Sequence, residues 1–178
     1  MDDSEYITFN AENNALDSLE KAIFFIQEAK IDPYNYKWVI ISLFNALYGF
    51  AVCAARGTSN IAISKTKKNG EEYLVDFDNI IKLCQNKDYM NMTVYSKPIT
   101  LSKNQTKAIK ILKDEFRNNF EHFTPKFWVI EVKKITQIIP DIIDIIHFLA
   151  LETGNYILFD NIKRNYVKEL LENGSNNT

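Results

Sequence analysis

The chain has 178 residues, of which 46% are hydrophobic, so its length and composition fit one domain with a sizeable core. Five glycines, four prolines and 25% charged residues exclude collagen-like, low-complexity and disordered classes for most of the chain. The formal charge of −2 excludes a general electrostatic binder of nucleic acid. Cys53 and Cys84, without a histidine cluster, indicate neither a disulfide framework nor a zinc site. The acidic start MDDSEY predicts no export signal, so we expect a cytoplasmic protein.

The first two predicted elements are helices. Apolar residues recur at helical spacing from Leu16 to Ile31. The second helix, from about Asn35 to Arg56, is apolar nearly all round, and Gly57 suits its C-terminal end. Trp38 to Ala55 carries no charge and approaches the length of a membrane span. Because polar residues interrupt it, we expect a core helix and no membrane contact.

The middle of the chain is less regular. Thr58 to about Leu74 is rich in polar residues and lysines, which predicts a long exposed loop. Apolar spacing from Phe77 to Leu83 predicts a short helix, and an irregular stretch follows through Pro98.

The clearest amphipathic pattern follows Ser102, a good N-cap, and ends at Thr124-Pro125. Its apolar stripe comprises Ala108, Ile109, Leu112, Phe116, Phe120 and Phe123. The next stretch, Trp128 to Ile139, we interpret as irregular or helical because it has no evident partner strand.

The C-terminal part predicts two more helices. Pro140 suits the first position of a helix that supplies a core face as far as Leu151 and closes at Gly154. A final amphipathic helix covers Leu158 to Leu171.

Together these elements predict an all-α, single-domain bundle of about five or six helices. We expect an N-terminal tail over residues 1–10, the helical domain over residues 11–171, and a disordered tail over residues 172–178.

Residues with catalytic chemistry gather at the end of the fourth main helix, in the segment RNNFEH. On a helical wheel Asn118 and His122 lie about 40° apart and share a face, whereas Arg117 lies about 140° from His122. The long Arg side chain, a distorted last turn or a second copy of the helix can bring Arg117 and His122 together. Dimerisation is the most economical of these solutions.

These residue types suit cleavage of a phosphodiester by its own 2′-hydroxyl. Histidine exchanges protons near neutral pH, arginine offers a fixed fork of donors to phosphate oxygens, and asparagine can orient either group. Such a reaction needs no metal or other cofactor, is restricted to RNA, and leaves a 2′,3′-cyclic phosphate.

The segment FRNNFEHFTPKFW, at the end of an amphipathic helix in an all-α chain, resembles the HEPN superfamily. The signature of that superfamily is an arginine, usually followed by a polar residue, and a histidine four to six positions further on. The resemblance implies a helical bundle that dimerises so that two motifs line one cleft. It also implies a metal-independent endoribonuclease of toxin-antitoxin or phage-defence systems, with RNA as substrate and an antitoxin protein as a possible partner. Thr124 stands where some of these toxins carry a tyrosine that a partner nucleotidyltransferase modifies, so we do not expect that form of control.

Other interpretations of the motif stay open. Arg117 and Glu121 are spaced to form an ordinary i,i+4 pair on a solvated face, with His122 capping the helix end. Some members of the superfamily are not catalytic, so the alternative function is a dimeric module that binds a nucleotide or a partner protein. A purely structural helical module is a third possibility.

Basic residues offer a path for RNA towards His122. Four lysines and Arg117 fall within an arc of about 120° opposite the apolar stripe, where they can guide a phosphate backbone or form a solvated face. The lysines are Lys103, Lys107, Lys110 and Lys113.

For several other residues we expect a structural role. Asp144 and His147 are spaced for a local hydrogen bond and lack a third metal ligand. We expect Asn45 to satisfy a hydrogen bond in the core, and the Cys53 thiol to be inert there. The aromatic side chains expected in the core rather than on a base-stacking surface are Tyr48, Phe127 and Trp128.

Overall fold

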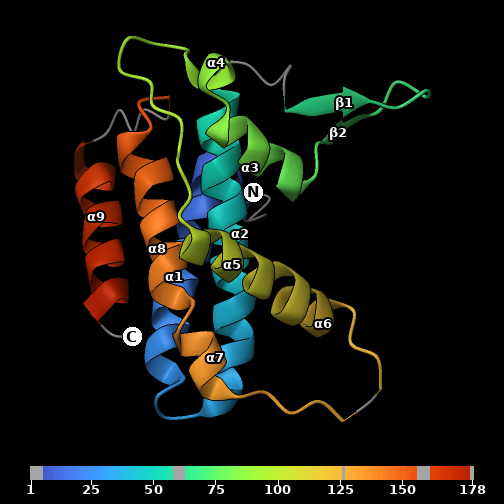
Figure 1. The fold of residues 1–178 in the computed structure, drawn as a ribbon, viewed down its shortest axis with the longest axis vertical. Helices are drawn as coiled ribbons and strands as arrows, with labels where there is room; N and C mark the ends of the chain where they lie inside the picture. The colour runs from blue at the N-terminus through green and yellow to red at the C-terminus, as the bar shows by residue number, and fades with distance from the viewer. Residues whose placement is uncertain (1–5, 58–62, 126, 156–160, 177–178) are drawn as a thin grey trace, which may run out of the picture.

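The computed structural model describes residues 6–57, 63–125, 127–155 and 161–176. In these ranges the chain forms an all-α bundle, which confirms the predicted fold class (Figure 1). The helices are α1 (Ala11–Glu28), α2 (Tyr36–Arg56), α3 (Phe77–Gln85), α4 (Lys87–Met90), α5 (Lys103–Lys110), α6 (Asn118–Glu121), α7 (Val132–Thr136), α8 (Ile139–His147) and α9 (Asn161–Asn176). The remaining elements are a 3₁₀ turn (Pro33–Asn35), strands β1 (Ser64–Thr66) and β2 (Glu72–Leu74), and two π-helical segments (Ile111–Arg117 and Phe148–Glu152).

Helix α2 is the centre of the bundle. It packs along α1 and also contacts α3 and α8 (Figure 1). It is long and apolar enough to cross a membrane by length and composition, but most of its side chains are buried inside the bundle. The prediction of a core helix is therefore confirmed. Its end is also as predicted, because Gly57 follows Arg56 with a φ of 53°, a conformation that glycine adopts without strain.

The contact between α1 and α2 is unusually close at one point. A Cβ atom placed on Gly49 would lie 2.7 Å from the Cβ atom of Ala15 and 3.0 Å from its Cα atom. The two helices therefore approach backbone to backbone at Gly49, where any larger side chain would clash with α1. The Arg56 guanidinium forms an ion pair with Glu12 at the same end of the α1–α2 contact, one turn of α1 before Ala15.

The loop expected between residues 58 and 74 is partly a β-hairpin. β1 and β2 pair antiparallel, with Ser64 opposite Leu74, and Figure 1 shows them projecting away from the bundle. Gly70 in the turn has a φ of 85°, and Lys67 forms an ion pair of 2.9 Å with Glu71 across it. Because both strands are short and mostly exposed, neither carries the apolar alternation that identifies a strand in a sequence. Residues 58–62 lie outside the described part of the chain.

The helix expected after Ser102 is present, but it is not a regular α-helix. Ser102 and Gln105 form a reciprocal capping box at its start. From α5 the chain continues through the π segment Ile111–Arg117 into α6, which ends at Glu121. Phe123, predicted to continue the apolar stripe, lies beyond this end and is 58% exposed, so that prediction is wrong.

The C-terminal elements also differ in detail from the prediction. Helix α7 occupies part of the stretch that we interpreted as irregular or helical, and Pro140 lies in the first turn of α8 as expected. Helix α9 continues to Asn176, so residues 172–176 are helical and the predicted disordered tail is wrong for them. The expected start of this helix at residues 158–160 lies outside the described residues, as do residues 177–178.

Cys53 in α2 and Cys84 in α3 are both buried, which makes the stability of the fold sensitive to alkaline pH. Burial raises the pKa of Cys53 and that of Cys84 to about 12, from an ordinary value of 9.0. Because unfolding would release these protons above pH 9, the thiols favour the folded state fully below that pH and progressively less between pH 9 and 12. We expect the free energy of unfolding, measured by urea titration, to fall across this window, and to fall less in a Cys53→Ala, Cys84→Ala double variant. An equal fall in both proteins would contradict the assignment to the thiols.

Candidate functional site

Arg117, the last residue of the π segment, is fixed by three contacts. The guanidinium lies over the ring of Phe44 in α2, with 4.8 Å between its central carbon and the ring centroid. Its Nη1 atom donates to Asn118 Oδ1 at 3.1 Å, and its Nη2 atom lies 2.5 Å from Glu121 Oε2. The Nε atom is buried and has no hydrogen-bond partner among the described residues. The side chain is therefore held in a defined place, with 28% of its surface exposed.

His122 lies at the end of α6 with a different environment. Its backbone N–H donates to the carbonyl of Asn118 at 2.9 Å, which closes the last turn of the helix. Its side chain is exposed, and no hydrogen bond or ion pair joins it to Arg117 within the part of the chain that is described. The structure thus brings Arg117 and Asn118 together and leaves His122 apart from Arg117, as the helical wheel indicates for a single chain.

The i,i+4 pair of the alternative interpretation is present. Arg117 and Glu121 are both partly buried, with side chains 28% and 29% exposed, so the pair does not lie on a fully solvated face. The partner that sequence reasoning missed is Phe44, because nothing in the sequence links this residue of α2 to the end of α6.

The π geometry explains why side chains depart from their positions on a regular wheel. The amide Nδ2 of Asn119 donates to the carbonyl of Glu115 at 2.6 Å, in competition with the backbone N–H that normally bonds there in an α-helix. A π turn holds about one residue more than an α turn, which rotates later residues by roughly 100° on a regular wheel. The four lysines and Arg117, predicted to share one arc of a regular helix, therefore do not form one continuous basic surface.

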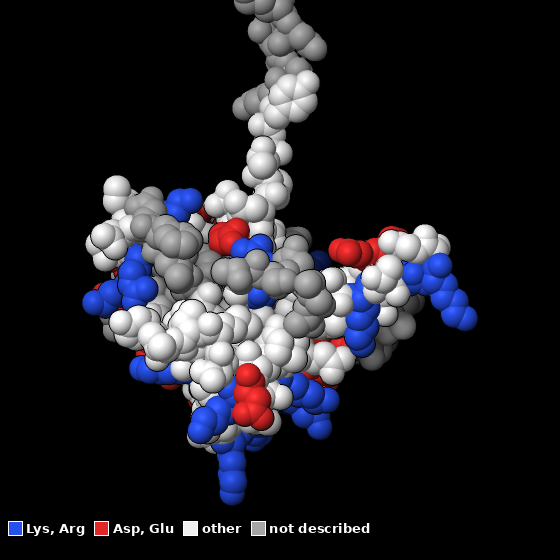
Figure 2. All heavy atoms as spheres, turned by 90° about the horizontal axis from the view of Figure 1, so that it is seen from above, with Lys and Arg blue, Asp and Glu red and all other residues white. Residues whose placement is uncertain are grey.

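The four lysines of that arc divide into two groups. Lys103, Lys107 and Lys110 are exposed on α5. Lys113 instead reaches α3, where its ammonium contacts both oxygens of Asp78 at 2.7 Å and lies 3.4 Å from Asp114. Seen from above, Lys and Arg side chains are scattered over the surface with Asp and Glu among them (Figure 2). No continuous basic track is visible on that face.

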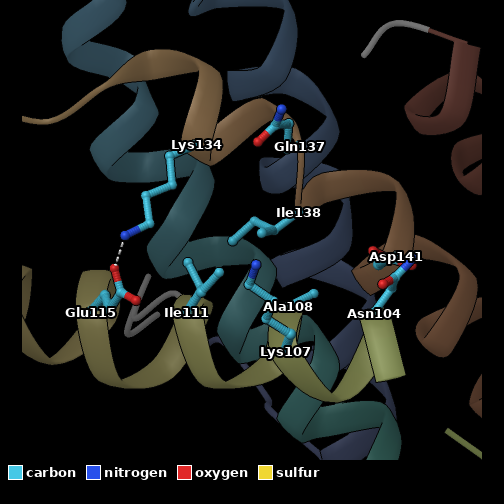
Figure 3. A pocket seen from close by; sticks show the side chains of 9 residues that line it. All are labelled: Asn104, Lys107, Ala108, Ile111, Glu115, Lys134, Gln137, Ile138 and Asp141. Atoms are coloured by element: carbon cyan, nitrogen blue, oxygen red, sulfur yellow. Dashed lines mark hydrogen bonds and ion pairs between the residues drawn. The ribbon is translucent and has the colours of Figure 1, made fainter. Parts of the chain in front are cut away.

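A polar pocket of about 480 Å³ lies between α5 with the π segment on one side and α7 with α8 on the other (Figure 3). Ala108, Ile111 and Ile138 supply apolar lining, and the ion pair between Lys134 and Glu115 closes one end. The rest of its lining is polar, namely Asn104, Lys107, Gln137 and Asp141. The pKa of Asp141 is raised by burial and by the nearby Asp144 carboxylate. The lining carries as many carboxylates as ammonium groups, so it does not select for a phosphate backbone.

An apolar groove of about 320 Å³ lies close to His122. The neighbours of His122 in sequence, Phe120 and Phe123, line it together with Trp128 and residues of the turn before α2. Tyr34 at its edge is 89% exposed. Trp128 packs against Phe120 with 4.9 Å between ring centroids, so one wall of the groove is fixed by the core. Exposed aromatic surface of this kind marks sites of protein association.

The remaining candidates have mainly structural roles. His147 bonds Glu152 at 3.1 Å rather than Asp144, and no group of three possible metal ligands occurs among the described residues. Asn45 is exposed, so the prediction of a core hydrogen bond is wrong. The prediction that Phe127 is a core residue is also wrong, since its side chain is fully exposed.

Two of the aromatic predictions are confirmed. Tyr48 donates to the carbonyl of Val75 at 2.7 Å, and its ring packs against Phe77. Trp128 contacts the rings of Phe116 and Phe120.

The chain matches no protein-family model, and neither the curated proteins nor the solved structures contain a significant match to it.

Proposed function

We propose that this protein is a metal-independent, HEPN-type endoribonuclease of the cytoplasm that acts as a homodimer. The observation that carries the proposal is that a fixed guanidinium and an exposed imidazole occur on one short helical segment. Arg117 is held on Phe44 and by Asn118, and His122 is free to meet a substrate at the end of the same segment.

In the proposed reaction the 2′-hydroxyl of RNA attacks the adjacent phosphorus and the bond to the 5′-oxygen breaks. His122 exchanges a proton with the attacking or the leaving oxygen. Arg117 stabilises the negative charge that develops on the non-bridging oxygens, and Asn118 orients the guanidinium through its 3.1 Å contact. The products are a 2′,3′-cyclic phosphate and a 5′-hydroxyl.

Within one chain Arg117 and His122 lie apart, and a second copy of the chain can supply the missing partner. The apolar groove beside His122 offers a surface on which two chains can associate. In a symmetric dimer the Arg117 of one chain then faces the His122 of the other across a shared cleft. An antitoxin protein that covers this cleft is the partner we propose for control, which places the enzyme in toxin-antitoxin or phage-defence systems.

One observation favours a second candidate function, a non-catalytic dimeric module that binds a nucleotide or a partner protein. The outer nitrogens of Arg117 are already engaged by Asn118 and Glu121. In this alternative the cleft binds its ligand without turnover.

The test is incubation of the purified protein with mixed tRNA and mRNA in excess EDTA. The ribonuclease predicts cleavage products with 2′,3′-cyclic phosphate ends and no cleavage of DNA of the same sequence, because DNA lacks the attacking hydroxyl. Binding of RNA without any cleavage would support the non-catalytic module instead.

A further inference from the structure

We propose that Glu121 is the counter-ion with which an RNA phosphate competes for Arg117, so that this carboxylate limits the affinity of the protein for RNA. The inference rests on the proposed ribonuclease function, in which Arg117 contacts the phosphate. It adds to that function a residue at a position that the Arg-polar-His signature leaves unspecified.

The geometry of the guanidinium carries the argument. A guanidinium binds phosphate with two parallel hydrogen bonds through one of two edges, either Nη1 with Nη2 or Nε with Nη2. Both edges include Nη2, the atom that lies 2.5 Å from the Glu121 carboxylate. Nε is buried, and Nη1 is engaged by Asn118. The edge left accessible is therefore that of Nη1 and Nη2, where a phosphate competes with the Glu121 carboxylate for Nη2.

The surroundings make this exchange of anions costly. Glu121 is on the same helix as Arg117, so after displacement its carboxylate stays within one helical turn of the incoming phosphate. Because both side chains are less than one third exposed, solvent screens the resulting repulsion less than it would at an open surface. A neutral side chain of the same shape removes the repulsion and keeps an oxygen that can accept from Nη2.

The matched control is Glu115. It is in the same continuous helical segment and pairs with Lys134, and among the described residues no hydrogen bond or ion pair joins its side chain to Arg117. Glu115→Gln and Glu121→Gln change the net charge of the protein equally, so a difference between them isolates the effect on Arg117.

The experiment measures binding separately from cleavage. A short fluorescein-labelled oligonucleotide with 2′-O-methyl groups throughout cannot cleave itself, and its Kd is read by anisotropy at several KCl concentrations. We expect Glu121→Gln to lower the Kd about tenfold at low salt and Glu115→Gln by less than about twofold. We expect the gain from Glu121→Gln to vanish when Arg117 is alanine.

Equal Kd values for the two glutamine variants, or a gain that persists without Arg117, would overturn the proposal. If Glu121→Gln does not fold, Glu121→Asp keeps the charge but shortens its reach to Nη2, and a smaller gain in affinity is expected. Cleavage by the wild type with no gain from Glu121→Gln refutes this inference alone. Tighter binding by Glu121→Gln in a protein that never cleaves RNA supports the inference and refutes the proposed catalysis.

Discussion

Replacement of His122 by alanine is expected to lower the rate of RNA cleavage about a thousandfold while leaving the fold intact. The side chain is exposed, and the hydrogen bond from His122 to the carbonyl of Asn118 uses the backbone N–H, which alanine retains. The free energy of unfolding should therefore change by less than about 0.5 kcal/mol. Initial cleavage rates and urea titrations of the two proteins check these two expectations. Full activity of the variant would remove His122 from the mechanism.

Mixing two inactive variants tests where each half of the site comes from. If Arg117 of one chain acts with His122 of the other, a mixed dimer of Arg117→Ala and His122→Ala chains has one intact site of its two. Since half of randomly assorted dimers are mixed, the mixture should recover about one quarter of the wild-type rate. A site built within one chain would give no recovery, which would contradict the shared cleft.

Replacement of Gly49 by valine is expected to destabilise the fold by about 3 kcal/mol. The added Cβ atom would meet Ala15 at 2.7 Å, and the nearest atoms belong to the backbone and Cβ of α1, so the two helices must move apart. For a chain of this length the loss corresponds to a fall of roughly 10 °C in Tm.

Gly174 provides the control, because it is another glycine within a helix. A Cβ atom there would lie 2.5 Å from Ile23 Cδ1 and 2.8 Å from Ile143 Cδ1, which are ends of side chains that can rotate away. Gly174→Ala should therefore be nearly neutral, since the gain in helix propensity offsets a small repacking cost. Thermal unfolding followed by circular dichroism compares the two variants with the wild type. An unchanged Tm for Gly49→Val would show that the α1–α2 contact is looser than described.

The sequence predicted the elements whose cause is local. The apolar character of α2, the Ser102 cap and Pro140 in the first turn of α8 each depend on a few neighbouring residues, and the structure has them as expected. The hairpin between residues 64 and 74 depends on a turn rather than on apolar alternation, so its strands were not identifiable.

The candidate site was predictable only as a set of residue types. The spacing of Arg117, Asn118 and His122 is visible in the sequence, and so is the i,i+4 relation of Arg117 to Glu121. The platform under the guanidinium comes from Phe44, some seventy residues earlier in the chain, and no local pattern indicates it. The π segment was also missed, because a helical wheel assumes 3.6 residues per turn throughout.

Because both thiols are buried, the rate at which a thiol reagent modifies them measures how often the natural chain opens. The Cys53 thiol in α2 lies near Glu12 of α1, whereas Cys84 in α3 contacts the carbonyl of Ala51 in α2 at 3.4 Å, so the two thiols report on different helix contacts. A thiol reagent modifies each of them only when the contact that buries it separates. Equal modification rates at both positions indicate opening of the bundle as a unit, whereas faster reaction at Cys84 indicates that α3 detaches from α2 by itself.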